Sequence, residues 1–270
     1  MAADDNVKTA DEIINANRAY WSKRARTYSE SIRDDELTNE FHRIWFDTLN
    51  GFITKRFPNR TPEQIHVLDI GTGPGFFSII LAEAGYMITA IDLTPSMLAE
   101  AKKNAGSLAG SPDGPIRFLE MNAEDLAFAE GSFDVIVTRN LTWDLPHPET
   151  AYAEWHRVLA PGGLLLNFDA NWYRYLFDDD ARVSYDKDRV NADAIGRFNE
   201  NPDVDYGVME EIAARIPLSS ILRPDWDIDY LTSIGFDAVS YDDIWETVWS
   251  DEDKVAYAST PMFLVHAVKK

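Results

Sequence analysis

The 270-residue chain contains no cysteine, which excludes disulfide bonds, thiolate metal sites and cysteine nucleophiles. Basic residues are also scarce, because 25 lysines and arginines stand against 46 aspartates and glutamates, a formal net charge of −21. A surface of this sign repels phosphate backbones instead of gathering them. We therefore expect no nucleic acid partner, and we expect no metal centre.

Long hydrophobic runs are absent as well. The longest apolar stretches have the length of strands, well short of the roughly 20 residues that a membrane-spanning helix needs. The first residues, Met-Ala-Ala-Asp-Asp, lack the basic start and apolar run of a secretory signal. We expect no membrane association and a cytoplasmic location. The 45% hydrophobic content is ample for a packed core.

The most informative segment is a short apolar strand that runs into three glycines at every second position, Val67-Leu-Asp-Ile-Gly71-Thr-Gly73-Pro-Gly75. Such a turn lets the backbone approach a nucleotide-like ligand and presents the unpaired N–H groups of a helix start to it. A dinucleotide fingerprint would need a further glycine at position 76, which is Phe76. A phosphate-binding P-loop would need Gly-Lys-Ser/Thr, which is also missing.

Polar residues follow the next strands at positions suited to the same ligand. The strand 87–91 ends at Asp92, 21 residues after Gly71, which is the usual offset for an acid that meets a ribose. A third strand leads to Asn122. A Pro161-Gly162-Gly163 turn then precedes another apolar strand.

These four motifs, in this order, resemble the class I S-adenosylmethionine-dependent methyltransferases over roughly residues 20–170, although many relatives carry an aspartate where this chain has Asn122. The resemblance implies S-adenosylmethionine as cofactor and S-adenosylhomocysteine as product. It also implies a set of cofactor contacts: Tyr28, Asp69, Gly71, Gly73, Gly75, Asp92, Leu93, Met97, Asn122, Ala123, Glu124 and Asn140. The resemblance implies that the amide oxygen of Asn122 accepts from the amino group of the adenine base, as an aspartate would.

The order of elements predicts an α/β fold, because strands near 65–70, 87–92, 115–120, 133–139 and 163–169 alternate with helices near 75–84, 95–106 and 148–159. A helix near 225–234 and strands near 236–245 and 262–268 follow. The resemblance implies a seven-stranded, Rossmann-like, doubly wound sheet, mostly parallel with an antiparallel last strand. Ligands bind such sheets at the carboxyl ends of the strands.

Four regions are expected along the chain. Residues 1–60 form an N-terminal helical segment over the cofactor site, in which Tyr28 touches the cofactor and Trp21 packs on the core. Residues 61–170 form the S-adenosylmethionine-binding core, and residues 225–270 complete its sheet. Residues 171–224 form a cap inserted after the fifth strand, since more than fifty residues with many aromatics stand where a short loop suffices.

Methyl transfer is an in-line displacement in which the protein mainly supplies alignment. A general base is needed only when the nucleophile must lose a proton, so no strict catalytic motif is expected. By position alone, Asp144 and His147 are acid–base candidates. The expected substrate contacts are Trp143, Asn171, Trp172 and Tyr173. An aromatic enclosure of this kind suits an apolar ring or a cation, and the acidic cap favours the cation.

The sequence thus predicts a methyltransferase that acts on a small molecule at O, N or S. Two alternatives stay open: a non-catalytic protein that binds S-adenosylmethionine or S-adenosylhomocysteine, and a nicotinamide-dependent oxidoreductase, which Phe76 and the lack of a Tyr-x-x-x-Lys motif disfavour. An aminopropyl transferase ranks lower, because it would carry a pair of pocket aspartates where this chain has Asp144 alone. No pattern indicates an oligomeric state.

Overall fold

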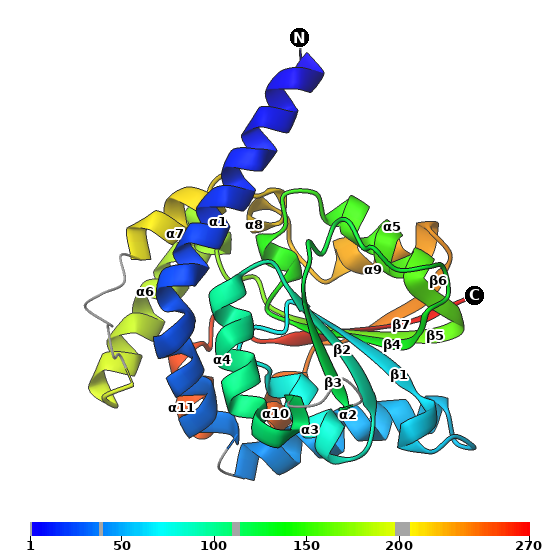
Figure 1. Cartoon of the computed structure of the whole chain (residues 1–270). Coiled ribbons are helices and arrows are strands. Elements are labelled where there is room, and N and C mark those ends of the chain that lie inside the picture. Colours follow the sequence, from blue (N-terminus) through cyan, green and yellow to red (C-terminus); the bar gives the residue numbers. More distant parts are fainter. Residues whose placement is uncertain (1, 38–39, 110–113, 198–205) are drawn as a thin grey trace.

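The computed structural model describes residues 2–37, 40–109, 114–197 and 206–270. Seven strands form one sheet in the order β3-β2-β1-β4-β5-β7-β6, and only β7 runs antiparallel to its neighbours (Figure 1). The strands are β1 (His66–Ile70), β2 (Met87–Asp92), β3 (Ile116–Glu120), β4 (Phe133–Arg139), β5 (Leu159–Asp169), β6 (Phe236–Tyr241) and β7 (Phe263–Lys269). The predicted fold is confirmed.

The central strands are apolar on both faces, because helices cover both sides of the sheet. Val135 and Leu164 face a core shared with α2 (Glu40–Arg56) and α3 (Phe76–Glu83). Their neighbours Ile136 and Leu165 point the other way, toward α5 (Pro148–Val158) and α9 (Asp225–Ser233). Successive side chains on a strand point to opposite faces, so continuous apolar runs give a sheet buried on both sides.

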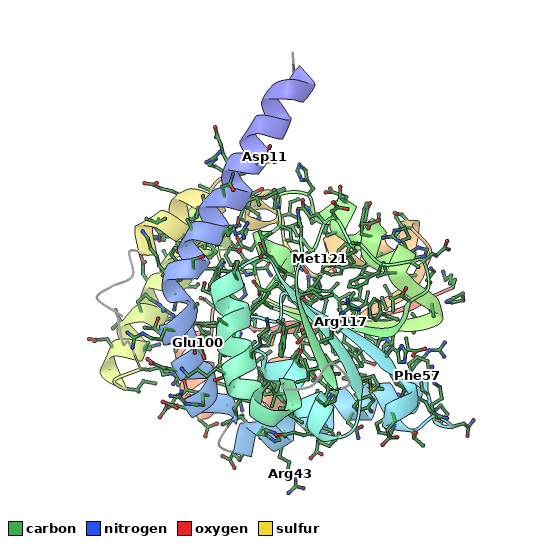
Figure 2. All side chains as sticks on the ribbon, in the orientation of Figure 1. Asp11, Arg43, Phe57, Glu100, Arg117 and Met121 are labelled. Carbon is green, nitrogen blue, oxygen red and sulfur yellow. The ribbon has the colours of Figure 1, made fainter. Side chains whose placement is uncertain are left out.

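The first helix, α1 (Ala2–Ile32), projects beyond the body of the molecule at its N-terminal end, where Figure 2 labels Asp11. Its C-terminal half lies along α4 (Pro95–Ala105), and a π-helical turn, η1 (Arg33–Leu37), follows it. This path carries α1 across the carboxyl ends of β2 and β3, where a bound ligand is expected.

The inserted segment after β5 is helical. It contains η5 (Arg174–Leu176), α6 (Asp179–Ala194), α7 (Tyr206–Ala213) and α8 (Pro217–Ser220), while residues 198–205 of the expected cap lie outside the described residues. Met209 and Ile212 of α7 pack with Ile13 and Tyr20 of α1 in a separate small core. The insertion and α1 therefore support each other above the sheet. The division into four regions stays a prediction.

Two predicted boundaries are wrong. The sixth strand ends at Tyr241 and not near 245, because α10 (Ile244–Val248) begins there and packs against α2. The fifth strand begins at Leu159, since the Pro161-Gly162-Gly163 turn is a bulge inside β5 and not a loop before it.

The remaining short helices are η2 (Pro62–Gln64), η3 (Gly106–Ala109), η4 (Thr142–Asp144) and α11 (Asp251–Ala256), which packs against α6. A bilayer crossing requires a long, uniformly apolar helix, and the described part of the chain contains no helix of that kind.

Candidate functional site

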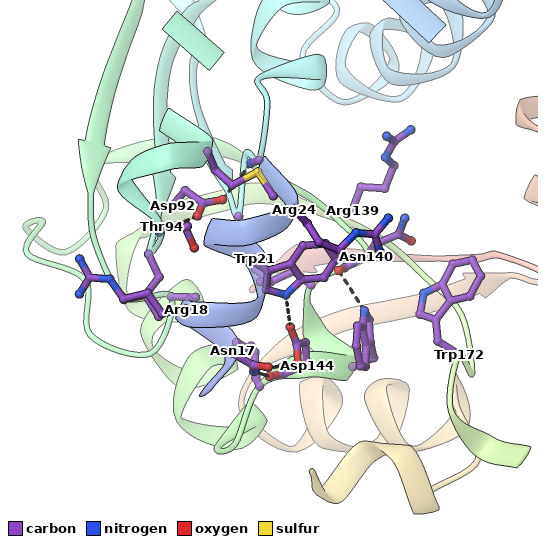
Figure 3. Close-up of a pocket in the computed structure, with 18 of the residues that line it drawn as sticks. Asn17, Arg18, Trp21, Arg24, Asp92, Thr94, Arg139, Asn140, Asp144 and Trp172 are labelled. Carbon is purple, nitrogen blue, oxygen red and sulfur yellow. Dashed lines mark hydrogen bonds between the residues drawn. The ribbon is translucent and has the colours of Figure 1, made fainter. Parts of the chain in front are cut away.

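A cavity of about 400 Å³ lies at the carboxyl ends of β1, β2 and β4, enclosed by α1, η4 and the inserted segment (Figure 3). It has two parts. We call the part formed by the strand ends the cofactor half: Gly71, Gly73, Asp92, Leu93, Met97, Asn122, Ala123 and Glu124. We call the part formed by η4, the inserted segment and the α11 region the acceptor half: Trp143, Trp172, Tyr173, Tyr175, Tyr185, Arg189 and Tyr257.

Two residues of the glycine motif, Asp69 and Gly75, stabilise the loop between β1 and α3 but do not line the cavity. Asp69 is buried and accepts hydrogen bonds from the hydroxyls of Thr72 (2.7 Å) and Ser78 (2.6 Å), and burial raises the pKa of Asp69 to about 6. Gly75 caps α3 with φ +92°, and a Cβ there would lie 3.2 Å from Cβ of Ala101. Both residues therefore hold the loop in shape without facing a ligand.

The other two glycines do line the cavity. Gly73 has φ +54° and donates its N–H to the Asp92 carboxylate (2.9 Å), and a Cβ on it would project toward the ring of Tyr28 at 3.9 Å. Asp92 also accepts the N–H of Thr94 (2.8 Å). A carboxylate can accept about four hydrogen bonds, so Asp92 keeps capacity for two hydroxyl donors. Burial raises the pKa of Asp92, although the two backbone donors oppose this.

Beyond β3, the residues Asn122, Ala123 and Glu124 line the cavity as the resemblance implied. Their polar atoms are partly engaged within the protein. The amide oxygen of Asn122 accepts the N–H of Glu124 (3.0 Å), and the Glu124 carboxylate accepts both the N–H and the ring Nδ1–H of His147 (2.7 and 3.0 Å). For Asn122 to contact a base as expected, its amide oxygen would have to accept a second hydrogen bond, from the amino group of the base, besides the one from Glu124.

Asn140, directly after β4, connects the two halves. Its φ is +56°, in the left-handed region that asparagine tolerates better than most residues. Its N–H donates to the carbonyl of Phe168 (2.8 Å), and its carbonyl accepts the indole N–H of Trp143 (3.0 Å). The side-chain oxygen is buried and has no hydrogen-bond partner among the described residues. A buried acceptor in this state favours a ligand that donates to it.

Of the two acid–base candidates, only Asp144 lines the cavity. Its carboxylate is buried and accepts the Asn17 amide (2.8 Å) and the Trp21 indole N–H (2.9 Å), both from α1 (Figure 3). Burial outweighs these two donors and raises the pKa of Asp144 to about 7. His147 instead points to Glu124 with 48% of its side chain exposed, outside the lining.

Three of the four expected substrate contacts, Trp143, Trp172 and Tyr173, come together in the acceptor half. Asn171 does not, because its amide donates to the carbonyl of Arg223 (2.9 Å) and accepts the N–H of the same residue (3.0 Å). Asn171 thus ties the start of the insertion to the segment before α9.

Several lining residues were not predicted from the sequence. Trp21, expected to pack on the core, lines the cavity, and so does Arg24. The signal was present, since Ile14, Trp21 and Tyr28 recur every seven residues and so share one face of α1. Tyr175, Tyr185 and Arg189 carried no such signal, because they belong to segments whose fold the sequence did not specify.

Comparisons with known proteins consistently find methyltransferases. A family model for a methyltransferase domain matches residues 68–167. The ubiquinone/menaquinone biosynthesis C-methyltransferase UbiE of Methylobacterium nodulans is 31% identical over 206 residues, which are 69% of this chain and 78% of that protein. UbiE of Nitrobacter hamburgensis is 33% identical over 138 residues, which are 50% of this chain and 53% of that protein. This chain thus spans about half the length of several such relatives.

Among solved structures, a phosphoethanolamine N-methyltransferase 2 of Haemonchus contortus in complex with phosphomonomethylethanolamine and S-adenosylhomocysteine has a TM-score of 0.54. The alignment covers 83% of this chain and 52% of that one, at 15% sequence identity. A likeness at this level of identity shows a shared fold.

Proposed function

Because this chain belongs to the class I S-adenosylmethionine-dependent methyltransferase family, we propose that it transfers a methyl group from S-adenosylmethionine to a small-molecule acceptor. The observation that carries the proposal is that one continuous cavity contains both the glycine loop with Asp92 and an aromatic acceptor half. A cofactor and a second small molecule can therefore lie against each other in the same cavity.

The cofactor half suits S-adenosylmethionine. Gly71 and Gly73 present backbone without side chains, and Asp92 keeps capacity for the two hydroxyls of a ribose. Leu93 and Met97 supply an apolar surface for the adenine. The unpartnered side-chain oxygen of Asn140 can accept from the ammonium group of the methionine portion. Tyr28 and Arg24 of α1 close the cavity over this end.

When bound, S-adenosylmethionine supplies a methyl group already activated by its sulfonium. The protein's residues then align the reaction. Asn140 and Trp143 hold the junction of the two halves through the bond from the indole to the Asn140 carbonyl. Trp21 and Tyr28 line the cavity from the side of α1. Alignment of this kind is the main contribution that a displacement of this type requires.

Asp144 is the better general base of the two candidates, because it lies in the cavity and its pKa of about 7 lets it accept a proton near neutral pH. For a hydroxyl acceptor, Asp144 would take the proton that the nucleophile loses. We then expect turnover to fall as the pH drops below about 7.

Calorimetric titration with S-adenosylhomocysteine tests the cofactor assignment. The wild-type protein should bind S-adenosylhomocysteine and not NADH, and Asp92→Ala should weaken binding at least tenfold with the same fold by circular dichroism. Asp237→Ala, at an exposed position of β6, is the matched control and should bind normally. Binding of NADH, or an unchanged affinity in Asp92→Ala, would contradict the assignment.

Turnover is tested by offering pooled small molecules together with a donor labelled at the methyl group. The curated relatives are named C-methyltransferases, so the pools should include carbon nucleophiles beside oxygen, nitrogen and sulfur nucleophiles. Labelled product supports methyl transfer. Tight S-adenosylhomocysteine binding without any labelled product would favour the non-catalytic binding protein.

Two variants of Asn140 separate the effect of its backbone conformation on stability from the effect of its side-chain amide on cofactor binding. Asn140→Ala should lower stability by about 1 kcal/mol, because alanine is strained at φ +56°, whereas Asn140→Gly should not suffer this strain. Both variants lose the amide, so both should lose S-adenosylhomocysteine affinity to a similar degree. If only Asn140→Ala lost both melting temperature and affinity for S-adenosylhomocysteine, while Asn140→Gly kept both, the amide would not contact the cofactor.

A further inference from the structure

The acceptor half has a chemical character that narrows the acceptor. We propose that it binds a planar aromatic molecule with a carboxylate, whose ring lies between two aromatic walls and whose carboxylate meets Arg189. This inference rests on the proposed function, since it assumes that the cofactor fills the other half of the cavity.

The first wall is a run of four rings. Trp143 stacks on Tyr173 with ring centroids 4.9 Å apart, Tyr173 contacts Tyr175 at 5.8 Å, and Tyr175 stacks on Tyr185 at 3.8 Å. The rings in each pair are within 38° of parallel. A run of aromatic rings gives an extended apolar surface against which another ring can pack, with its edge or with its face.

The second wall is formed by Trp172, the neighbour of Tyr173 in the chain, and by Tyr257, which follows α11. Trp172 meets the ring of Tyr257 edge-to-face at 5.8 Å. In Figure 3 the Trp172 indole lies across the cavity from Trp21, with its nitrogen toward the interior. This Nε1 is buried and has no hydrogen-bond partner among the described residues. A buried donor of this kind favours a ligand that offers an oxygen.

Arg189 of α6 spans the two walls. Its guanidinium carbon lies 5.0 Å from the ring centroid of Tyr185, in the first wall, and 5.4 Å from that of Tyr257, in the second. Its Nη2 donates to the carbonyl of Ala256, which fixes the head group. A guanidinium has five N–H donors in a planar fork that matches a carboxylate. A ligand ring between the walls would therefore place a carboxylate substituent at this fork.

The charges of the cavity are compatible with an anionic acceptor. The carboxylates that line it are Asp92 and Glu124, in the cofactor half, and Asp144, which is bonded to α1. Asp144 is the carboxylate beside the acceptor half, and Arg189 is the cation among the seven residues that define this half. The expectation that the acidic segment favours a cationic acceptor is therefore not supported inside the cavity, because the acids of α6 lie elsewhere on the helix.

Calorimetry on the protein saturated with S-adenosylhomocysteine tests this proposal without relying on turnover. The probes are 4-hydroxybenzoate and 6-hydroxy-2-naphthoate, each paired with its neutral carboxamide, and tyramine as a cationic phenol. At least one carboxylate should bind ten or more times tighter than its carboxamide, and tyramine should bind more weakly still. Equal binding of acid and amide in both pairs, no binding of any probe, or tighter binding of tyramine would overturn the proposal.

Variants of Arg189 test whether this residue causes the preference for the carboxylate over its carboxamide. Arg189→Gln should abolish the difference between acid and amide, and Arg189→Lys should restore part of it, while the affinity for S-adenosylhomocysteine stays that of the wild type. Arg182→Gln is the matched control, since Arg182 lies on the same helix over Tyr175 and Tyr185 but outside the cavity lining, and it should keep the preference. A preference that survives in Arg189→Gln would overturn the assignment. Loss of S-adenosylhomocysteine binding in the wild type would instead contradict the proposed function.

Discussion

Asp144 lies in the cavity, and burial raises the pKa of its carboxyl group from 3.8 to about 7. Between these two values the folded protein holds a proton that the unfolded chain releases. Stability therefore falls as the pH rises from about 4 to about 7, and this contribution is constant above that range.

We predict that Asp144→Asn removes this dependence. Relative to the wild type, the variant should gain up to about 1.4 kcal/mol of stability per pH unit between pH 5 and pH 7, with no further gain above pH 7. Denaturant unfolding of both proteins at several pH values measures the difference. The exposed Asp237→Asn is the control and should follow the wild type. A constant difference between Asp144→Asn and the wild type over this range would contradict the prediction.

Single site residues were predictable where a local backbone motif fixes their position. Gly71, Gly73 and Asp92 fall where the motif places them, because a tight turn and a strand end leave little freedom. Asn171 was misplaced because its partner Arg223 follows 52 residues later. No local pattern reveals such a contact.

At the scale of elements, a buried ionic cluster joins the end of β5, the η4 turn and α9. Arg223 bonds to Asp169 and to Asp227, and the Arg223 and Asp169 side chains are fully buried. Asp169 also accepts the backbone N–H of Trp143 (2.9 Å), so the cluster holds one aromatic wall of the cavity in place. Burial raises the pKa of Asp169 even beside Arg223.

We predict that Arg223→Ala lowers the free energy of unfolding by about 3–5 kcal/mol, because it leaves two buried carboxylates without their cation. Denaturant unfolding measures this loss. Arg43→Ala is the control, since Arg43 forms an exposed pair with Asp47 on α2, and it should change stability by less than about 0.5 kcal/mol. If the two variants lost similar stability, the cluster would not be a structural element.

The strands of the core followed from continuous apolar runs, because a parallel sheet that is buried on both faces leaves this signature. The sixth strand was drawn too long because Ile244 and Trp245 extend its apolar pattern into α10. The insertion was recognised by its length, and Trp172 and Tyr173 at its start were expected at the site, but Tyr175 and Tyr185 were not. Their arrangement depends on docking against α1 and α11, which no single segment encodes.

At the scale of the whole molecule, the net charge of −21 repels itself. Salt shortens the range of that repulsion to about 8 Å at 0.15 M. We predict that raising NaCl from 10 to 200 mM increases the melting temperature by about 2–5 °C. Differential scanning calorimetry measures the shift, and sodium sulfate at equal ionic strength checks that screening is the cause. A melting temperature that falls with added salt would show that attractive pairs outweigh the net repulsion.

The tryptophan content gives the cavity a further property. Of the eight tryptophans in the chain, Trp21, Trp143 and Trp172 line the cavity, whereas Trp45 and Trp155 are buried in the two cores beside the sheet. The emission of an indole responds to polarity and to aromatic neighbours within contact distance. Intrinsic fluorescence should therefore change when either half of the cavity is filled, and the Trp45 and Trp155 signals should stay constant. The protein carries its own optical probe of occupancy.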